Sequence, residues 1–377
     1  MEVMEVGIEM EPRKRPRKAS GKAAKAHAEA AATEAARAAA AAEEEERSWK
    51  WWEEFQKVLA NPPTPEELRE REESWEKFCS ESWERFRDRW IDVWLHGKIP
   101  FDAVTQIPCM RFTDANFRHP GFPYMVMPED TLQVVSVQVK DLTGGLQWPL
   151  DVYGVVAVRD GVDRMRNVVF SRERDDCQSI NEQDSYLTLT GPSRGVVMSH
   201  DNSHLEVMLK VKGTTKSEDK DLNKFVDSYR LGCFLPIEYT SKLCTVEMQY
   251  YTALGSVEAT IFVRVFKGRW PHGFRGLLTA STCKKRDVQI SLLDLNDDEL
   301  PVDADGFVKL SRRVICVEKD GKMGLSIFQR GAGGEEGRAI AGIWIAAKDA
   351  GKATHYMPVE VLDCWMEVTV AWSLFSL

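Results

Sequence analysis

Hydrophobic and polar residues alternate with a period of two along most of the chain beyond Glu129. In "HLEVMLKVKG" and in "VEATIFVRVF", every second residue is apolar. The residues that share these apolar faces are Leu205, Val207, Leu209 and Val211 in the first segment, and Val257, Ala259, Ile261, Val263 and Val265 in the second. Alternation of this kind predicts β-strands that bury one face.

Further apolar runs are separated by clusters of turn-forming residues such as "TGPSRG" and "KDGK". The runs fall near 132–139, 152–158, 186–190, 243–251, 287–293, 314–318, 323–328, 339–347 and 367–374. A parallel sheet would need long helical crossovers between its strands, and only "SEDKDLNKFVDSY" offers a short candidate. We therefore predict a mainly β fold: an antiparallel β-sandwich or distorted barrel, with an N-terminal amphipathic helix and a low-complexity N-terminal arm.

Ahead of the β region, aromatic residues recur at spacings of three and four, which is typical of one face of a helix. They are Trp75, Phe78, Trp83, Phe86, Trp90 and Trp94. The prolines of "NPPTPEELRERE" break any preceding helix, and Thr64 followed by Glu67 forms an N-cap signature. We expect a helix that ends near Gly97. Its aromatic face must be covered, either by a partner or, as we expect, by the protein's own β domain.

These patterns divide the chain into three regions. Residues 1–60 form a low-complexity basic and Ala/Glu-rich arm that is partly helical or disordered. Residues 61–128 hold the Trp-rich helix and a Pro-rich connector, and residues 129–377 the β domain of unknown function. The arm carries a candidate nuclear-import signal, which consists of Arg13, Lys14, Arg15, Arg17 and Lys18.

The net charge and the cysteine content indicate which binding partners and which cellular compartment to expect. The formal net charge is -9, so the chain as a whole does not favour generic binding to nucleic acid. No apolar run approaches the roughly 20 residues of a transmembrane helix. The eight cysteines form no CxxC pair and several lie in apolar strand patterns, which is typical of a reducing compartment. We expect a cytoplasmic or nuclear protein.

The sequence contains no motif that identifies a reaction, a cofactor or a metal. "GAGGEEG" lacks the Lys and the helix of a phosphate-binding loop, and "DADG" has no Glu closing a calcium loop. No catalytic residue, cofactor or metal ligand is therefore predicted.

"LQWPLDVYGVVAVRD" raises the question whether the polar residues at its ends form a ligand site or a structural network. We predict a buried or half-buried Arg–carboxylate network at the sheet ends, in which the carboxylates and Arg159 pair with the later arginines. Its members are Asp151, Arg159, Asp160, Arg166, Arg172 and Arg174.

An ordered series of segments resembles a plant family of grasses known as domain of unknown function 6598. The series is "LQWPLDVYGVVAVRDGVDRMRNVVFSRERDDCQSI", "DSYLTLTGPSRGVV", "LEVMLKVKG", "SEDKDL", "VEATIFVRV" and "GFRG". The resemblance covers roughly residues 129–377 and implies a mostly β domain. Some relatives are joined to a ribosome-inactivating N-glycosidase domain, but this sequence has no such catalytic segment in a helical context.

The expected function is a non-enzymatic protein-interaction module, an adaptor whose partner is a protein that the sequence does not identify. One alternative is binding of anions or phospholipids through loops that contain Arg164, Arg166, Lys216 and Lys220. A second alternative, a ribosome-associated or stress-response factor or an enzyme, follows from family association alone.

Overall fold

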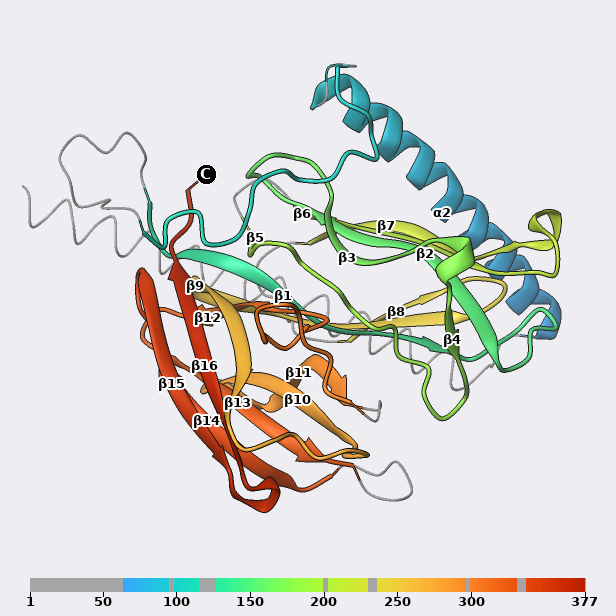
Figure 1. The fold of residues 1–377 in the computed structure, drawn as a ribbon. Helices are drawn as coiled ribbons and strands as arrows, with labels where there is room; N and C mark the ends of the chain where they lie inside the picture. Colours follow the sequence, from blue (N-terminus) through green and yellow to red (C-terminus); the bar gives the residue numbers. More distant parts are fainter. Residues whose placement is uncertain are drawn as a thin grey trace, which may run out of the picture. The chain divides into compact units, whose positions relative to one another are not determined.

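The computed structural model describes residues 64–94, 96, 98–114, 126–198, 203–229, 236–295, 299–330 and 337–376. Helix α2 spans Pro65–Val93. The strands are β1 (Glu129–Lys140), β2 (Leu150–Arg159), β3 (Asn167–Arg172), β4 (Gln178–Ile180), β5 (Val196–Val197), β6 (Ser203–Val211), β7 (Lys220–Tyr229), β8 (Ile237–Thr240), β9 (Thr245–Lys267), β10 (Gly276–Thr282), β11 (Lys285–Leu295), β12 (Val314–Glu318), β13 (Lys322–Gln329), β14 (Ala339–Ala346), β15 (Gly351–Val359) and β16 (Cys364–Ser373). The fold is mainly β and antiparallel, as the sequence predicts (Figure 1).

Helix α2 starts with the predicted cap. The backbone N–H of Thr64 donates to the Glu67 carboxylate at 2.8 Å, and the N–H of Glu67 donates to the Thr64 hydroxyl at 3.2 Å. This reciprocal capping box confirms the predicted start of the helix. The helix ends at Val93, four residues before the predicted Gly97. Within the described residues, no helix is long and apolar enough to cross a membrane.

Across the described residues the strands form three sheets. The β2 sheet has the order β3-β2-β6-β7, with β4 beside β2, and the β10 sheet has the order β11-β10-β13-β14. The third, which we call the shared sheet, has seven strands in the order β15-β16-β9-β1-β5, with β8 and β12 also paired to β9. The sheets stay open at their edges, so the β domain is not a closed barrel.

Strand β9 runs through both halves of the shared sheet. Its N-terminal half pairs with β1 and β8, and its C-terminal half pairs with β12 and β16. Gly255 lies between the halves at a φ of 51°, a left-handed conformation that glycine adopts without steric cost. The register of β1 against β9 shifts at the same point, between Glu129 and Thr131. We interpret Gly255 as the bend of one continuous strand.

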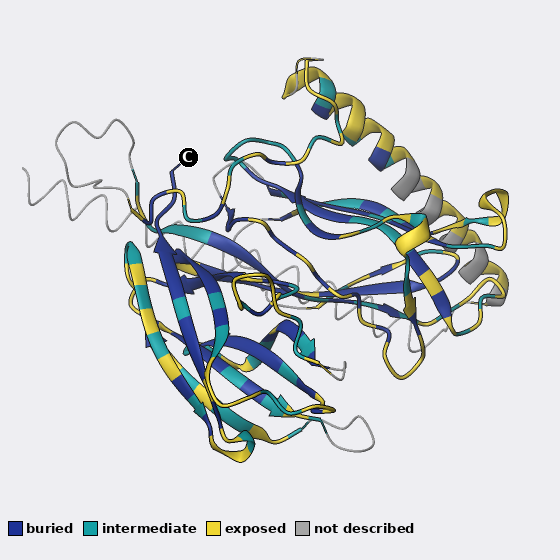
Figure 2. Ribbon diagram, viewed as in Figure 1, coloured by how far each residue is buried: buried dark blue, intermediate teal, exposed yellow. Residues whose placement is uncertain are grey.

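Two hydrophobic cores result, and both are visible as dark blue stretches in Figure 2. In the first sandwich, the β2 sheet packs on β1, β8 and the N-terminal half of β9. In the second sandwich, the β10 sheet packs on β12, β15, β16 and the C-terminal half of β9. Where the alternation predicts one large sandwich, the structure therefore has two that share a sheet.

Candidate functional site at the junction of the sandwiches

The aromatic face of helix α2 packs on the β2 sheet, on the side away from the first core. Trp83 and Trp90 are each 3% exposed. The rings of Phe86 and Trp90 contact His204 of β6, with centroids 5.1 and 5.0 Å away. The indole N–H of Trp90 donates to the backbone carbonyl of Arg164 at 3.1 Å. These contacts fix the C-terminal half of the helix on its own β domain.

Trp94 lies at the margin of this packing, with its ring centroid 6.0 Å from that of Trp90. Trp94 is 41% exposed, and the guanidinium of Arg164 lies 4.0 Å from its ring centroid. The side chains of Trp75 and Phe78 fall outside the described residues.

The helix covers a triad of buried charges. Arg159 of β2 and Arg166 both bind the carboxylate of Glu206 on β6; the Arg166 Nε to Glu206 Oε2 distance is 2.8 Å. All three side chains are buried. The guanidinium of Arg159 lies 4.3 Å from the ring centroid of Phe101. Burial lowers the pKa of Arg159, although the charge of Glu206 opposes that shift. A guanidinium nevertheless keeps its charge in proteins, so this is a desolvated, structural ion cluster.

The six residues predicted to form one network lie in separate groups. Asp151 is exposed and accepts a hydrogen bond from the Ser179 hydroxyl. Arg172 binds Asp176 at 2.7 Å on the surface. The predicted pairing of the carboxylates with Arg166, Arg172 or Arg174 is therefore replaced by pairs to residues that lie elsewhere in the sequence.

Arg174 forms a cluster at the end of the β2 sheet where β6 leads into β7. Its guanidinium binds Asp219 at 2.8 and 3.1 Å, and the Tyr153 hydroxyl donates to the same carboxylate at 2.8 Å. The hydrogen bond from Arg174 holds the pKa of Asp219 well below its usual range. Burial, together with the bond to Asp219, raises the pKa of Tyr153 to about 12. The charges of Arg174 and Asp219 offset each other, and the cluster fixes the loop between β6 and β7 to β2.

Asp160 lies at the junction of the two sandwiches. Its carboxylate binds Arg194 in a two-point contact of 2.6 and 2.9 Å and accepts the backbone N–H of Val197 at 3.0 Å. Arg194 also reaches Asp163 at 3.1 Å. Burial works against the charge of Arg194, but the hydrogen bonds and charge of Asp160 outweigh it and raise the pKa. The pair anchors the start of β5 to the end of β2.

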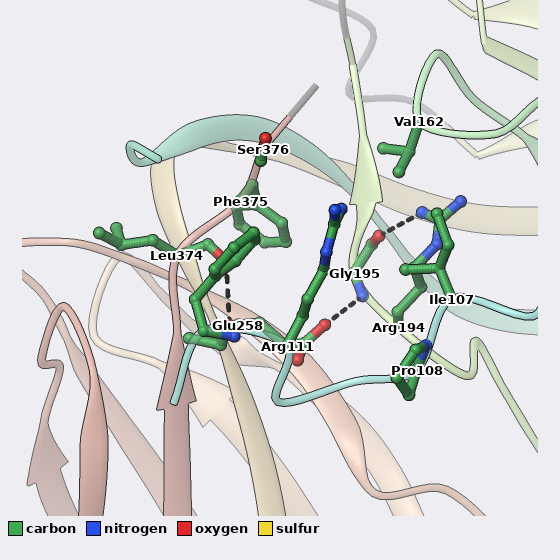
Figure 3. A pocket seen from close by; sticks show the side chains of 12 residues that line it. Ile107, Pro108, Arg111, Val162, Arg194, Gly195, Glu258, Leu374, Phe375 and Ser376 are labelled. Carbon is green, nitrogen blue, oxygen red and sulfur yellow. Dashed lines mark hydrogen bonds between the residues drawn. The ribbon is translucent and has the colours of Figure 1, made fainter. Parts of the chain in front are cut away.

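Glu258 of β9 is the second acidic residue at this junction. Its carboxylate accepts the backbone N–H of Met110 at 2.7 Å and that of Gly195 at 2.8 Å. Burial raises its pKa, although both N–H donors and the charge of Arg194 act in the opposite direction. The carbonyl of Gly195 in turn accepts a hydrogen bond from Arg194 at 3.0 Å (Figure 3). One glycine residue thus links the two buried charged groups.

A small pocket opens beside these groups (Figure 3). Its lining residues are Ile107, Pro108, Arg111, Phe112, Val162, Arg194, Gly195, Glu258, Ser373, Leu374, Phe375 and Ser376. The enclosed space has room for about one or two water molecules. Ser373 accepts the N–H of Phe112 at 3.0 Å and donates to the carbonyl of Leu374 at 2.9 Å. Its hydroxyl therefore ties the segment at Phe112 to the end of β16, and its proton is donated to a backbone carbonyl.

The positions of the described side chains also bear on metal binding and on the alternative of anion binding through loops. Among the described residues, no group of His, Cys, Asp and Glu is arranged to hold a metal ion. Arg164 and Arg166 lie beyond the end of β2 that pairs with His204. At the other end of the sheet, Lys216 follows Val211 along the chain and Lys220 of β7 lies opposite Val211. The residues named for the alternative of anion or phospholipid binding are thus divided between the two ends of the β2 sheet.

The sequence reading missed an exposed aromatic face on the outer side of the shared sheet. We define the aromatic face as Phe262, Arg264 and Phe266 of β9, Phe307, Tyr356 of β15, and Trp365 and Glu367 of β16. Cross-strand register places Tyr356 opposite Glu367 and Glu367 opposite Arg264, so these side chains share one side. The period-two spacing of Phe262, Arg264 and Phe266, on the side opposite the core residues of β9, was the available signal.

Three rings of this face are open to solvent. Phe266, Tyr356 and Trp365 are 56%, 49% and 42% exposed, and the rings of Phe266 and Tyr356 lie 5.0 Å apart. Between the rings, the Arg264 Nε binds the Glu367 carboxylate at 2.7 Å. The central charges of the face therefore neutralise each other.

Comparison with known proteins places the chain in a family. The family model described as "Domain of unknown function (DUF6598)" matches residues 131–370, which span both sandwiches. The chain belongs to this family. The basic residues Arg13, Lys14, Arg15, Arg17 and Lys18 lie outside the family match and outside the described residues.

No curated protein matches the chain. Among solved structures, it is similar to human GIVD cytosolic phospholipase A2, with 10% identity, a TM-score of 0.20, and coverage of 65% of this chain and 33% of that chain. The same enzyme in complex with methyl gamma-linolenyl fluorophosphonate matches with 10% identity, a TM-score of 0.21, and coverage of 65% and 32%. The chain thus spans about a third of the length of these structures, and likeness of this degree carries no functional argument.

Proposed function

We propose that the protein is a non-enzymatic protein-interaction module that binds its partner through the aromatic face. The observation that carries this proposal is the group of exposed rings of Phe266, Tyr356 and Trp365 on one side of the shared sheet. Large aromatic side chains lose little conformational entropy when they are buried, and they dominate the binding energy of many protein interfaces.

The charge arrangement indicates what the partner presents. Arg264 and Glu367 already form an ion pair at the centre of the face, so a partner supplies no countercharge there. An apolar, uncharged protein segment would bury the rings without desolvating an unpaired charge. A nucleic acid, in contrast, needs a row of uncompensated basic residues.

The buried charged groups at the junction of the two sandwiches would be the first candidates for a catalytic role. Their contacts instead support a structural role. Asp160, Arg194 and Glu258 each bind backbone groups or one another, and the adjacent pocket is small. In this proposal, their contribution is to hold the connector that precedes β1 and the start of β5 against the shared sheet.

We further propose that the protein works in a reducing compartment, the cytoplasm or the nucleus. The six cysteines whose side chains the structure describes are free, and four of them are buried. Burial raises the pKa of the Cys244 and Cys316 thiols to about 12, so these thiols stay protonated and unreactive at neutral pH.

The proposal is tested by site-specific photo-crosslinking from position 356 in cells, followed by binding measurements with the purified captured protein. Tyr356→Ser and Trp365→Ser are expected to weaken binding at least about tenfold, because each removes an exposed anchor. Tyr186→Ser, at a residue 46% exposed in the segment between β4 and β5, is the matched control and should bind as the wild type does. Equal affinity of all variants for the captured protein would contradict the proposal.

A further inference from the structure

Edge strands carry unpaired backbone groups, and most proteins protect them with charged residues or proline. The longer edge strands of this protein follow that rule. The protecting residues are Arg172 in β3, Lys220 and Asp221 in β7, Arg286 and Asp287 in β11, and Lys352 and Pro358 in β15. An edge strand without such residues is therefore a candidate for pairing with a strand of another molecule.

Strand β14 is such a strand. Its sequence, "AIAGIWIA", contains no charged residue and no proline. In the described part of the chain it pairs with β13 on one side and forms the end of the β10 sheet. Four of its residues are exposed, and Trp344 is 50% exposed. An apolar, exposed edge of this length is a template for another strand.

The residues of β14 are complementary to a second copy of the same strand. When two copies pair antiparallel about Ile343, each Trp344 lies opposite Gly342 of the other copy. On the core side, Ile343 lies opposite Ile343, and Ile345 lies opposite Ala341 of the second copy. Residues opposite each other in this register share a face of the sheet, as continuation of the two cores requires.

In the existing pair of β13 and β14, Trp344 also lies opposite a glycine. Trp344 is the register partner of Gly324, and a Cβ at Gly324 would lie 3.0 Å from the indole ring. The indole therefore lies over a residue without a side chain. The far end of the ring lies over β13, and the Arg286 guanidinium of β11 lies 5.4 Å from the ring centroid. The indole is therefore turned away from the open edge of β14 and does not block the approach of a second strand.

We propose that β14 pairs with β14 of a second copy across a two-fold axis and joins two β10 sheets into one continuous sheet. This goes beyond the proposed function and uses a different surface from the aromatic face. The strand is flanked by Arg338, which precedes the register shift at Ile340, and by Lys348, so two-fold pairing brings like charges near each other at both ends of the joined strands. Because salt screens like charges, the dimer should become tighter as ionic strength rises.

The first test is sedimentation equilibrium of the full chain over a range of concentrations and salt. We expect a dimer whose dissociation constant rises at least about tenfold in Trp344→Lys, because the lysines oppose an apolar strand. Ala346→Lys, at another exposed position, should have the same effect and leaves the indole over Gly324. Trp365→Lys, on the aromatic face, is the control and should keep the dimer.

The register is tested by cysteine substitution and mild oxidation. Ile343→Cys should form an intermolecular disulfide, because the two copies of residue 343 face each other at the symmetry axis within the reach of a disulfide. Ala341→Cys should not, because its two copies are displaced along the strands. A wild-type chain that remains monomeric at every concentration would overturn the proposal. So would a dimer that both lysine variants retain. Neither result would affect binding through the aromatic face.

Discussion

Arg159 and Asp160 are consecutive residues that bind oppositely charged side chains on opposite faces of the β2 sheet. Arg159 faces helix α2 and binds Glu206, whereas Asp160 faces the sandwich junction and binds Arg194. Successive side chains of a strand point in opposite directions, so the end of β2 holds two independent attachments. One fixes the helix and the other fixes the start of β5.

Glu206→Gln should be among the most destabilising conservative changes in the protein. The carboxylate holds two buried guanidinium groups, and its neutralisation leaves both without a countercharge. We expect the free energy of unfolding to fall by about 3–5 kcal/mol, measured by urea denaturation. Glu182→Gln, at an exposed turn residue, should change it by less than about 0.5 kcal/mol. A similar small change in Glu206→Gln would show that the triad is solvated.

Helix docking is tested by a pair of tryptophan substitutions. Trp90→Phe removes the indole N–H that binds the Arg164 carbonyl at a buried site, and we expect a loss of about 1–3 kcal/mol. Trp94→Phe changes a residue that is 41% exposed and should cost less than about 0.5 kcal/mol. Urea denaturation followed by circular dichroism measures both. Equal losses would mean that the two indoles contribute alike to docking.

Glu258 should make stability fall as pH rises. Its folded-state pKa is raised above the ordinary 4.5, so the native state binds the proton more tightly than the unfolded state does. The resulting penalty is absent below about pH 4.5 and grows until the pH passes the folded-state pKa. Unfolding free energies at a series of pH values should show this decline in the wild type and a smaller one in Glu258→Gln. Identical pH profiles would contradict the raised pKa.

Asp219 should have the opposite dependence. Arg174 holds its pKa below the ordinary 3.8, so the native state binds the proton more weakly. Its contribution to stability is therefore present above about pH 3.8 and is lost as the pH falls towards the folded-state value. Asp219→Asn should flatten the acid limb of the stability profile. Asp175→Asn, at an almost fully exposed residue, should leave that limb unchanged.

Gly195 and Phe375 should be energetically coupled. A Cβ at Gly195 would lie 2.6 Å from the Phe375 ring, so Gly195→Ala has to displace that ring. We expect a loss of about 1–3 kcal/mol from overpacking. The smaller side chain of Phe375→Leu should make the alanine less costly, so the double variant should be more stable than the sum of the two single losses implies. Additive losses in a double-mutant cycle would show that the two sites are independent.

The fold class follows from the sequence because alternation identifies which side of each strand is buried. Leu205, Val207 and Leu209 are indeed buried in the first core, as the period-two pattern predicts. The same pattern assigns Glu206 to the solvent side, where the structure buries it under helix α2. Alternation describes one strand at a time and does not reveal what covers its other face.

The partners in the candidate site were harder to predict because they are distant in the sequence. Asp160 pairs with Arg194, which lies in the turn-forming segment "TGPSRG". Glu258 binds backbone N–H groups, and because nearly every residue has one, the sequence does not indicate which of them it binds. Gly255 was equally ambiguous, since a glycine between two apolar runs fits a turn as well as a bend within one strand. Only the pairing of both halves of β9 decides between them.

The continuity of β9 has a consequence for how the β domain loses its structure. Neither sandwich has a complete wall without this strand, so melting of one removes a wall from the other. A chain cut within β9 should yield two halves that remain unfolded apart and regain structure only when they are mixed. The two sandwiches together, and not either one alone, then form the smallest unit that can fold by itself. A family match that extends across both sandwiches agrees with this unit.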